Sequence, residues 1–222
     1  MPVTDPFATG ESRPHGAILA GGASRRMGCP KSLVELAGRP LLQHVIDRLA
    51  PQVQALVLSV EHSDPSMDGF ALPQLPDPMP GHRGPLGGLL AALRHFDDAQ
   101  SWLLLAPCDA PFLPLDLADR LHACAQRVGA PAAVAVETGV WQPTFSIWQG
   151  SLLPKVERAV LEAGEGGLKR FLREAGAATC SWPDDGGAPS PFFNINDRAT
   201  LEQAEHWLRP AKSGRERLPC SA

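Results

Sequence analysis

The sequence predicts a single α/β domain in which helices flank a mainly parallel central sheet. Short apolar runs alternate with amphipathic stretches through the first half of its 222 residues, and this rhythm is typical of parallel sheets wrapped by helices. The composition, 44% hydrophobic and 20% charged residues, is that of an ordinary soluble globular protein. The formal net charge of −4 argues against a general binder of nucleic acid or anionic membranes, which normally carries a basic excess.

Three apolar runs bounded by turn residues predict buried strands at 17–20 (AILA), 55–60 (ALVLSV) and 102–107 (WLLLAP). Amphipathic stretches that alternate with these runs predict helices over 40–49, 84–96 and 114–128. Pro40 is expected at the first helical position, where its missing N–H costs nothing.

The second half departs from this alternation. Residues 131–137 and 142–148 have strand-like patterns, and the short connection between them suits a hairpin. The remaining patterns predict helices over 154–164 and 167–176, a short strand over 179–182 and a closing helix over 198–208.

We expect the folded domain to span residues 15–208, with a flexible leader at 1–14 and a flexible tail at 209–222. The leader has no apolar core of signal-peptide length, and no stretch approaches the roughly 18 apolar residues of a membrane span. A cytoplasmic protein is therefore expected. Its five cysteines are odd in number and include no C-x-x-C pair, so they are interpreted as reduced thiols.

A glycine-rich stretch follows the first predicted strand, within GAILAGGASRRMGCPK at residues 16–31. Small residues at such a turn leave backbone N–H groups accessible to an anion, and Arg25, Arg26 and Lys31 would add charge for a polyphosphate. The stretch is not a P-loop, because two residues separate Gly28 from Lys31, and it lacks the G-x-G-x-x-G fingerprint. The alternative is an arginine-rich surface loop with glycines for turning.

The same stretch resembles the signature L-A-[GA]-G-x-x-x-R-M-G-x-x-K of sugar-phosphate-type nucleotidyltransferases, and reads LAGGASRRMGCPK at 19–31. Within that group the chain is most similar to the molybdenum cofactor guanylyltransferases over about residues 16–208. The supporting stretches are LPDPMPGHRGPLGG, LLLAPCDAPFLP, QPTF and FFNINDRATLEQAE. The resemblance implies a Rossmann-like domain of the nucleotide-diphospho-sugar transferase type. It also implies transfer of GMP from GTP to the phosphate of molybdopterin, with release of pyrophosphate.

The resemblance assigns the phosphates and the metal to three residues. Arg26 and Lys31 would hold the β- and γ-phosphates and stabilise the departing pyrophosphate. Asp109, which follows the most apolar strand, would bind Mg²⁺, an ion that usually takes one or two carboxylates. Taken alone, Asp109 could instead cap a turn between prolines. No protein nucleophile is expected, because the acceptor's own phosphate attacks and such transfers depend on positioning and charge neutralisation.

Further contacts are implied along the chain. The nucleotide would be bound by Leu19, Ala20, Gly21, Gly22, Lys31, Ser59, Asp77, Gly84 and Gly88. Asp77 would contact guanine or ribose, or would be only a turn residue between prolines. Asn194 and Asn196, as alternate residues of a strand, would face the pterin together, or would cap the next helix. Ser59 stands where the family often has asparagine, and its shorter side chain puts that contact in question.

Two rival functions remain open at this stage. A cytidylyltransferase or sugar-phosphate enzyme would keep the chemistry, whereas a nucleotide-binding regulatory protein would keep only the fold. Gly21 favours GTP, since guanylyl enzymes tend to have glycine and cytidylyl enzymes alanine at that signature position. The expected partners are GTP and molybdopterin, with a GTP-binding adaptor and molybdoenzyme chaperones as further candidates, and the chain would be a monomer or weak homo-oligomer. No nucleic acid partner is expected.

Overall fold

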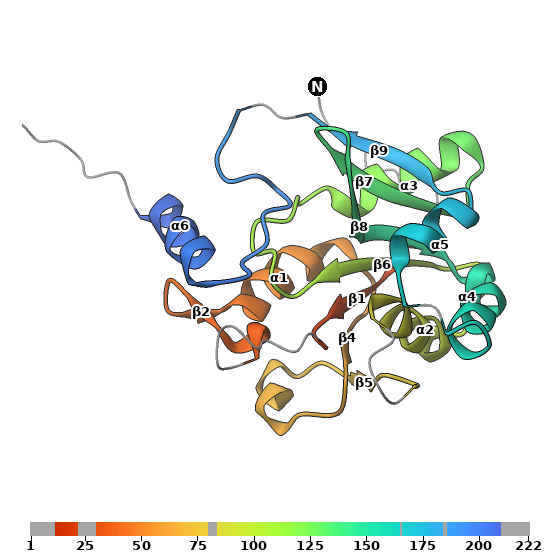
Figure 1. The fold of residues 1–222 in the computed structure, drawn as a ribbon, viewed down its shortest axis with the longest axis horizontal. Helices are drawn as coiled ribbons and strands as arrows, with labels where there is room; N and C mark the ends of the chain where they lie inside the picture. Colours follow the sequence, from red (N-terminus) through yellow and green to blue (C-terminus); the bar gives the residue numbers. More distant parts are fainter. Residues whose placement is uncertain (1–11, 22–29, 80–83, 165, 184–185, 210–222) are drawn as a thin grey trace, which may run out of the picture.

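The structure is a computed structural model that describes residues 12–21, 30–79, 84–164, 166–183 and 186–209. Its centre is a seven-stranded sheet (Figure 1). Across the sheet the strands run β5 (Gln74–Pro76), β4 (Leu56–Val60), β1 (His15–Leu19), β6 (Trp102–Pro107), β8 (Val140–Gln149), β7 (Ala132–Glu137) and β9 (Ala178–Trp182).

The sheet is mainly parallel, as the sequence predicts. β5, β4, β1 and β6 run parallel to one another, and β9 runs parallel to β7. Only β8 is antiparallel to its two neighbours, β6 and β7. The carboxyl ends of β1, β4, β5 and β6 therefore meet at one edge, which is where open α/β sheets bind their ligands.

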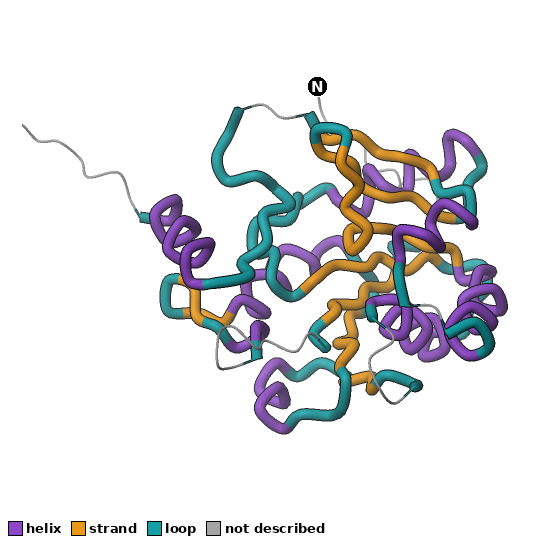
Figure 2. The backbone as a smooth tube through the Cα atoms, in the orientation of Figure 1, coloured by secondary structure: helices purple, strands orange, loops and turns teal. Residues whose placement is uncertain are grey.

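Helices cover both faces of the sheet (Figures 1 and 2). One face packs against α1 (Leu41–Leu49) and α3 (Leu117–Val128) through one continuous apolar core. The opposite face packs against α2 (Pro85–Phe96), α4 (Leu153–Leu161) and α5 (Leu168–Glu174) through a second core. The central strands have fully buried side chains on both faces, which explains why they read as continuous apolar runs instead of alternating ones.

The last helix, α6 (Arg198–Leu208), lies apart from these layers. It packs on a small antiparallel pair, β2 (Glu35–Leu36) and β3 (Arg39–Pro40), through its own apolar cluster. Within that cluster the Trp207 ring makes edge-to-face contacts with Phe112 and Phe193. Short 3₁₀ turns complete the described chain at Lys31–Leu33, Ala50–Gln52, Pro65–Phe70 and Gly150–Leu152.

The helices and strands expected over the ranges given above are present with small shifts at their ends, but the strand expected to carry Asn194 and Asn196 is absent from the described residues 193–197. Pro40 precedes α1 as its N-cap, so its expected place at the first helical position was wrong by one residue. The predicted hairpin joins β7 to β8 through Thr138 and Gly139, both with positive φ, as the commonest two-residue hairpin turn requires. The antiparallel pair β2–β3 and the strand β5 were not predicted. Strands β2 and β3 have two residues each, and β5 has three.

The boundaries expected for the domain fall close to the limits of the described chain. Most of the leader and nearly all of the tail lie outside the described residues. At the inner end of the leader, the Pro14 carbonyl accepts a hydrogen bond from the Gln54 amide. No helix in the described ranges is both long and apolar enough to cross a membrane. The described cysteines Cys108, Cys124 and Cys180 are buried free thiols.

Candidate nucleotide-binding and catalytic site

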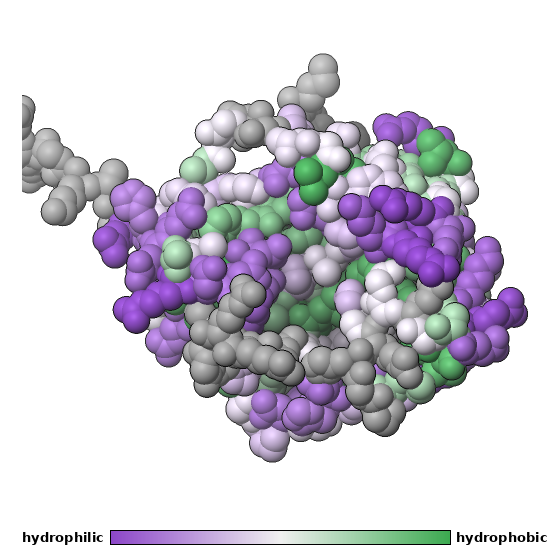
Figure 3. Space-filling view, in the orientation of Figure 1, coloured by the Kyte–Doolittle hydropathy of each residue, from purple (hydrophilic) through white to green (hydrophobic). Residues whose placement is uncertain are grey.

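A cavity of about 560 Å³ lies at the carboxyl edge of the parallel strands. A hollow is visible near the middle of the face drawn in Figure 3, with hydrophobic residues at its floor and hydrophilic residues along its left side. The cavity is lined by Leu19, Gly21, Lys31, Ser59, Val60, Glu61, Asp77, Gly84, Pro85, Gly88, Pro107, Cys108, Asp109 and Thr144. Its lining therefore comes from the ends of β1, β4, β5 and β6 and the residues just after them, from the 3₁₀ turn that begins at Lys31, from the start of α2 and from β8.

The cavity unites most of the described residues that the sequence predicted to bind nucleotide or metal. Those it brings together are Leu19, Gly21, Lys31, Ser59, Asp77, Gly84, Gly88 and Asp109. Ala20 does not line it; its side chain is buried in the core and its amide donates to the Ser59 carbonyl at 2.7 Å. Gly22, Arg25 and Arg26 lie outside the described residues.

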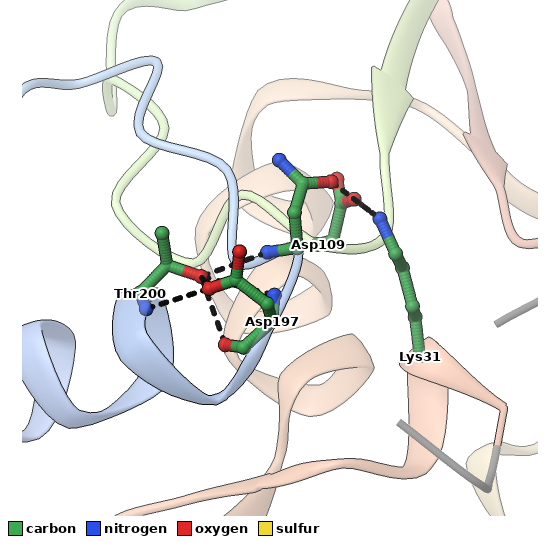
Figure 4. A network of polar contacts seen from close by, with 5 residues as sticks. Lys31, Asp109, Asp197 and Thr200 are labelled. Atoms are coloured by element: carbon green, nitrogen blue, oxygen red, sulfur yellow. Dashed lines mark hydrogen bonds and ion pairs between the residues drawn. The ribbon is translucent and has the colours of Figure 1, made fainter. Parts of the chain in front are cut away.

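Lys31 and Asp109 meet although 78 positions separate them in the chain (Figure 4). The Lys31 Nζ donates to Asp109 Oδ2 at 2.8 Å, and the two side chains are 23% and 14% exposed. Nζ also donates to Asn196 Oδ1 at 2.5 Å. The site thus holds a partly buried cation whose charge is balanced by one carboxylate and whose remaining donor can reach an anionic ligand.

The backbone fixes both partners of this ion pair. Asp109 lies two residues beyond the end of β6, and its carbonyl accepts a hydrogen bond from the Ile195 amide at 2.8 Å. Lys31 begins a 3₁₀ turn that packs against α1. Asn196 lies just before α6. Its hydrogen bond to Lys31 therefore links the start of the last helix to the cavity at the carboxyl edge of the sheet.

The interpretation of Asn194 and Asn196 as alternate residues of a strand was wrong, because residues 193–197 are not in a strand. Neither asparagine caps the next helix: the N-cap of α6 is Asp197, whose carboxylate accepts from the Thr200 amide at 2.9 Å in a capping box. The buried Oδ1 of Asn194 has no hydrogen-bond partner among the described residues. Neither residue lines the cavity, although Asn196 contacts Lys31.

Asp77 is a turn residue that also lines the cavity. Its Oδ1 accepts a hydrogen bond from the Met79 amide at 3.0 Å, which makes it a turn residue. Its carboxylate also lines the cavity at the start of α2. A Cβ added at Gly87 would lie 2.7 Å from Asp77 Oδ2, so the absent side chain lets this carboxylate lie against the first turn of the helix.

The glycines around the cavity serve close backbone packing. A Cβ at Gly88 would lie 2.3 Å from Ser59 Oγ and 2.6 Å from Leu19 Cδ2, so α2 approaches β1 and β4 more closely than alanine allows. Gly84 has φ +70°, which favours glycine. At Gly21 a Cβ would meet the Glu61 amide nitrogen at 3.0 Å. A methyl group at Gly21 would therefore press on the backbone at the end of β4.

Cys108 lies beside Asp109 and lines the same cavity. Burial raises the pKa of its thiol to about 12, and the neighbouring Asp109 charge adds to the increase while Lys31 opposes it. The thiol is therefore protonated at neutral pH and is a poor nucleophile.

The donor set suits Mg²⁺ carried by a nucleotide. Within the described residues no group of three or more His, Cys, Asp or Glu side chains could hold a metal ion by itself. Asp109 offers one carboxylate, and Glu61 lines the same cavity. Mg²⁺ usually takes one or two carboxylates and completes its shell with phosphate oxygens and water.

Sequence reasoning gave no role to two polar residues of the cavity, Glu61 and Thr144. Glu61 could have been found from its place just after a parallel strand, where side chains face the ligand edge. Thr144 belongs to the QPTF stretch, which supported the family resemblance, but the resemblance assigned no role to the residues of that stretch.

The MobA-like NTP transferase domain family matches residues 16–210. A molybdenum cofactor guanylyltransferase of Rhodopseudomonas palustris (strain BisB5) is 40% identical over 210 residues, which cover 92% of this chain and 96% of the relative. One of Rhizobium meliloti (strain 1021) is 38% identical over 201 residues, covering 88% and 92% of the two chains.

Solved structures share the architecture. Molybdopterin-guanine dinucleotide biosynthesis protein A from Archaeoglobus fulgidus superposes with a TM-score of 0.69 and 25% identity, covering 87% of this chain and 97% of that one. A CMP:2-keto-3-deoxy-manno-octonic acid synthetase complexed with CTP gives 0.65 at 14% identity, covering 88% and 98%, and shows the fold alone. Because the family match and the relatives both span most of the chain, this protein belongs to the MobA-like NTP transferase domain family.

Proposed function

We propose that this protein transfers GMP from GTP to the phosphate of molybdopterin, forming a molybdopterin guanine dinucleotide and pyrophosphate. The observation that carries the proposal is the meeting of Lys31 and Asp109 in one cavity at the ligand edge of the sheet. The guanylyltransferase names of relatives at 38–40% identity support GTP and molybdopterin as substrates.

The reaction needs positioning and charge neutralisation more than covalent help from the protein. An oxygen of the molybdopterin phosphate attacks the α-phosphorus of GTP. A new P–O bond forms there, the bond from that phosphorus to the oxygen shared with the β-phosphate breaks, and pyrophosphate leaves with the electron pair. Lys31 would hold the phosphates and offset the charge that develops on pyrophosphate. Arg26 is proposed for the same task from the sequence signature.

Asp109 would hold Mg²⁺, with Glu61 as the second carboxylate in reach of the cavity. When bound, the ion supplies positive charge to the phosphate oxygens. Lys31 must then move from Asp109 towards the phosphates, and its long, flexible side chain permits that movement.

The nucleoside and the acceptor would occupy opposite ends of the cavity. Asp77, at the end of β5, would take guanine N–H or ribose hydroxyl donors, with Ser59 beside it. Leu19, Gly21, Gly84 and Gly88 would give the base a surface of backbone and apolar atoms. Asn194 and Asn196 remain proposed for the pterin side, since both lie in the segment that packs beside Asp109.

The wider setting follows from the family resemblance. A GTP-binding adaptor and molybdoenzyme chaperones would be the protein partners, and a cytoplasmic monomer or weak homo-oligomer would be the working form. Residues 1–14 and 209–222 would be a flexible leader and tail.

The proposal is tested by incubating the protein with Mg²⁺, molybdopterin and GTP, ATP, CTP or UTP in turn. Pyrophosphate release is measured and the product is identified by mass. We expect the guanine dinucleotide, with GTP at least about tenfold better than CTP in kcat/KM, since a pyrimidine would leave polar groups of the site unpaired. A cytosine product would overturn the guanylyl assignment. GTP binding without pyrophosphate release would instead indicate a regulatory nucleotide-binding protein.

A further inference from the structure

Strand β8 contains a bulge that begins at a proline. Val134 of β7 pairs with Ser146, but the next residue, Ala135, pairs with Gln142. Residues 143–145 therefore have no partner in β7. Proline cannot donate a ladder hydrogen bond, and within sheets it is confined largely to edges, strand starts and bulges. Pro143 thus explains why this central strand is interrupted here.

The bulge is held in place by buried contacts on both of its sides. The fully buried Ser146 donates from its hydroxyl to the Pro143 carbonyl at 2.8 Å, and accepts from Trp148 Nε1 at 2.8 Å. The Phe145 ring is fully buried and makes an edge-to-face contact with Phe192, with centroids 4.8 Å apart. The backbone that carries Thr144 is consequently fixed on each side.

The bulge places Thr144 in the cavity lining, which also includes Pro107 at the end of β6. Bulges next to active sites commonly redirect a side chain in this way. Across the described chain, no hydrogen bond is found for the Thr144 hydroxyl. The hydroxyl therefore offers the cavity a donor that is held by rigid backbone and is not satisfied by a described protein group.

The sheet order determines which substrate this donor faces. Along the edge, the lining residues run from Asp77 after β5, through Ser59 on β4, to Asp109 after β6, and then to Thr144 on β8. Thr144 thus lies on the far side of Asp109 from the proposed nucleoside end. A group bound there faces the reacting phosphates from the acceptor's direction.

We infer that Thr144 is a substrate-binding residue whose hydroxyl donates a hydrogen bond to the phosphate of the acceptor. This inference rests on the proposed function and deepens it, because it assigns the acceptor phosphate to the β8 side of Asp109. A phosphate accepts hydrogen bonds through all of its free oxygens, so a single fixed hydroxyl can orient it for attack without adding charge.

The test compares Thr144→Val, which keeps the shape and removes the donor, with Thr144→Ser, which keeps the donor. For Thr144→Val we expect the KM for molybdopterin to rise about tenfold, the usual scale for losing one hydrogen bond. The KM for GTP should stay within about twofold of wild type, and Thr144→Ser should restore most of the lost affinity. The dissociation constant of molybdopterin, measured directly by its fluorescence without GTP, should follow the same order.

Thr179→Val is the matched control, because Thr179 is an exposed residue of β9 and does not line the cavity. Thermal unfolding of each variant shows whether the bulge survives. An unchanged KM and dissociation constant for molybdopterin in Thr144→Val would overturn the inference, as would a selective rise in the KM for GTP. If the wild-type protein neither binds molybdopterin nor transfers GMP, the proposed function fails as well, and that result is distinct from a failure of Thr144 alone.

Discussion

Lys31 balances the charge of Asp109 at a place where neither side chain is fully solvated. The two are 23% and 14% exposed, and their atoms lie 2.8 Å apart. Removing one member of a partly buried pair leaves the other charge without its partner, which costs more than the loss of an exposed surface pair. Substitution of Lys31 or Asp109 should therefore disturb the site more than a substitution of similar size at an exposed ion pair.

Asp109→Asn should lower turnover by about a hundredfold or more, because it keeps the shape but removes the charge proposed to hold the metal. The measurement is kcat at saturating GTP and molybdopterin over a range of Mg²⁺ concentrations. Asp97→Asn is the matched control: Asp97 is exposed at the left-handed end of α2, where asparagine is also tolerated. Activity of Asp109→Asn within threefold of wild type would rule out the metal-binding role.

Lys31→Ala should weaken GTP binding about tenfold and lower kcat further, because it removes the cation that pairs with Asp109, the carboxylate proposed to hold the metal. Calorimetric titration with GTP and steady-state kinetics measure the two effects. The control is Lys155→Ala, at an exposed position of α4. Arg120→Ala would be a less suitable control, because the Arg120 guanidinium stacks on the Trp182 ring at 4.0 Å. Equal losses in the two lysine variants would show that Lys31 is not a phosphate ligand.

Asp109 was singled out because it follows the most apolar strand, and Lys31 because it closes the signature of the glycine-rich stretch. The structure brings the two side chains together. Thr144 could not be predicted, because its position in the cavity depends on a bulge that shifts β8 by three residues against β7. Asn196 was predicted to face the pterin. Its hydrogen bond to Lys31 joins residues that are 165 positions apart, and local sequence patterns cannot predict a contact at that separation.

At the scale of elements, α2 is the part of the fold that most directly shapes the cavity. Its first turn carries Gly84 and Pro85 into the lining, and Gly88 brings the helix against the strands. Glycine inside a helix costs roughly 0.5–1 kcal/mol relative to alanine. That cost is offset by the close approach of α2 to Ser59 and Leu19.

Gly88→Ala should destabilise the fold by about 1–3 kcal/mol despite its better helix propensity, because overpacking pushes α2 away from β1 and β4. The same displacement should weaken GTP binding. Urea unfolding and GTP titration measure the two effects. Gly69→Ala is the control, since a Cβ at Gly69 meets nothing within 4 Å and its backbone needs no positive φ. A Gly88→Ala protein as stable as wild type would show that α2 is not held at this contact.

Long periodic elements were predictable from sequence, and short or irregular ones were not. Helices such as α1 and α3 show an apolar stripe that burial against the sheet requires. Strand β5 has only three residues and pairs because β4 lies beside it, a tertiary reason that its own sequence does not reveal. Residues 193–197 alternate like a strand but stay irregular, since they pack between α6 and Asp109 instead of joining the sheet.

At the scale of the whole molecule, two cores on opposite faces of one sheet hold the cavity edge in place. The core that packs against α1 and α3 also buries Cys108 and Cys180, whose thiols can ionise in the unfolded chain. Burial raises the pKa of Cys108 to about 12, and burial likewise raises that of Cys180 to about 12. The ordinary value for both is 9.0, so folding and thiol ionisation oppose each other at alkaline pH.

The free energy of unfolding should therefore fall as pH rises from about 9 towards 12. In this range the unfolded chain releases the Cys108 proton while the folded protein retains it, and alkali favours the state that binds fewer protons. Below pH 9 both states hold the proton, and this contribution to stability is complete. Urea midpoints at pH 7.5 and pH 10 measure the change. Cys108→Ala should show a smaller alkaline loss than wild type, whatever its stability at pH 7.5, and Cys108→Ala/Cys180→Ala a smaller loss still. An identical alkaline loss in wild type and both variants would mean that the buried thiols do not govern alkaline unfolding.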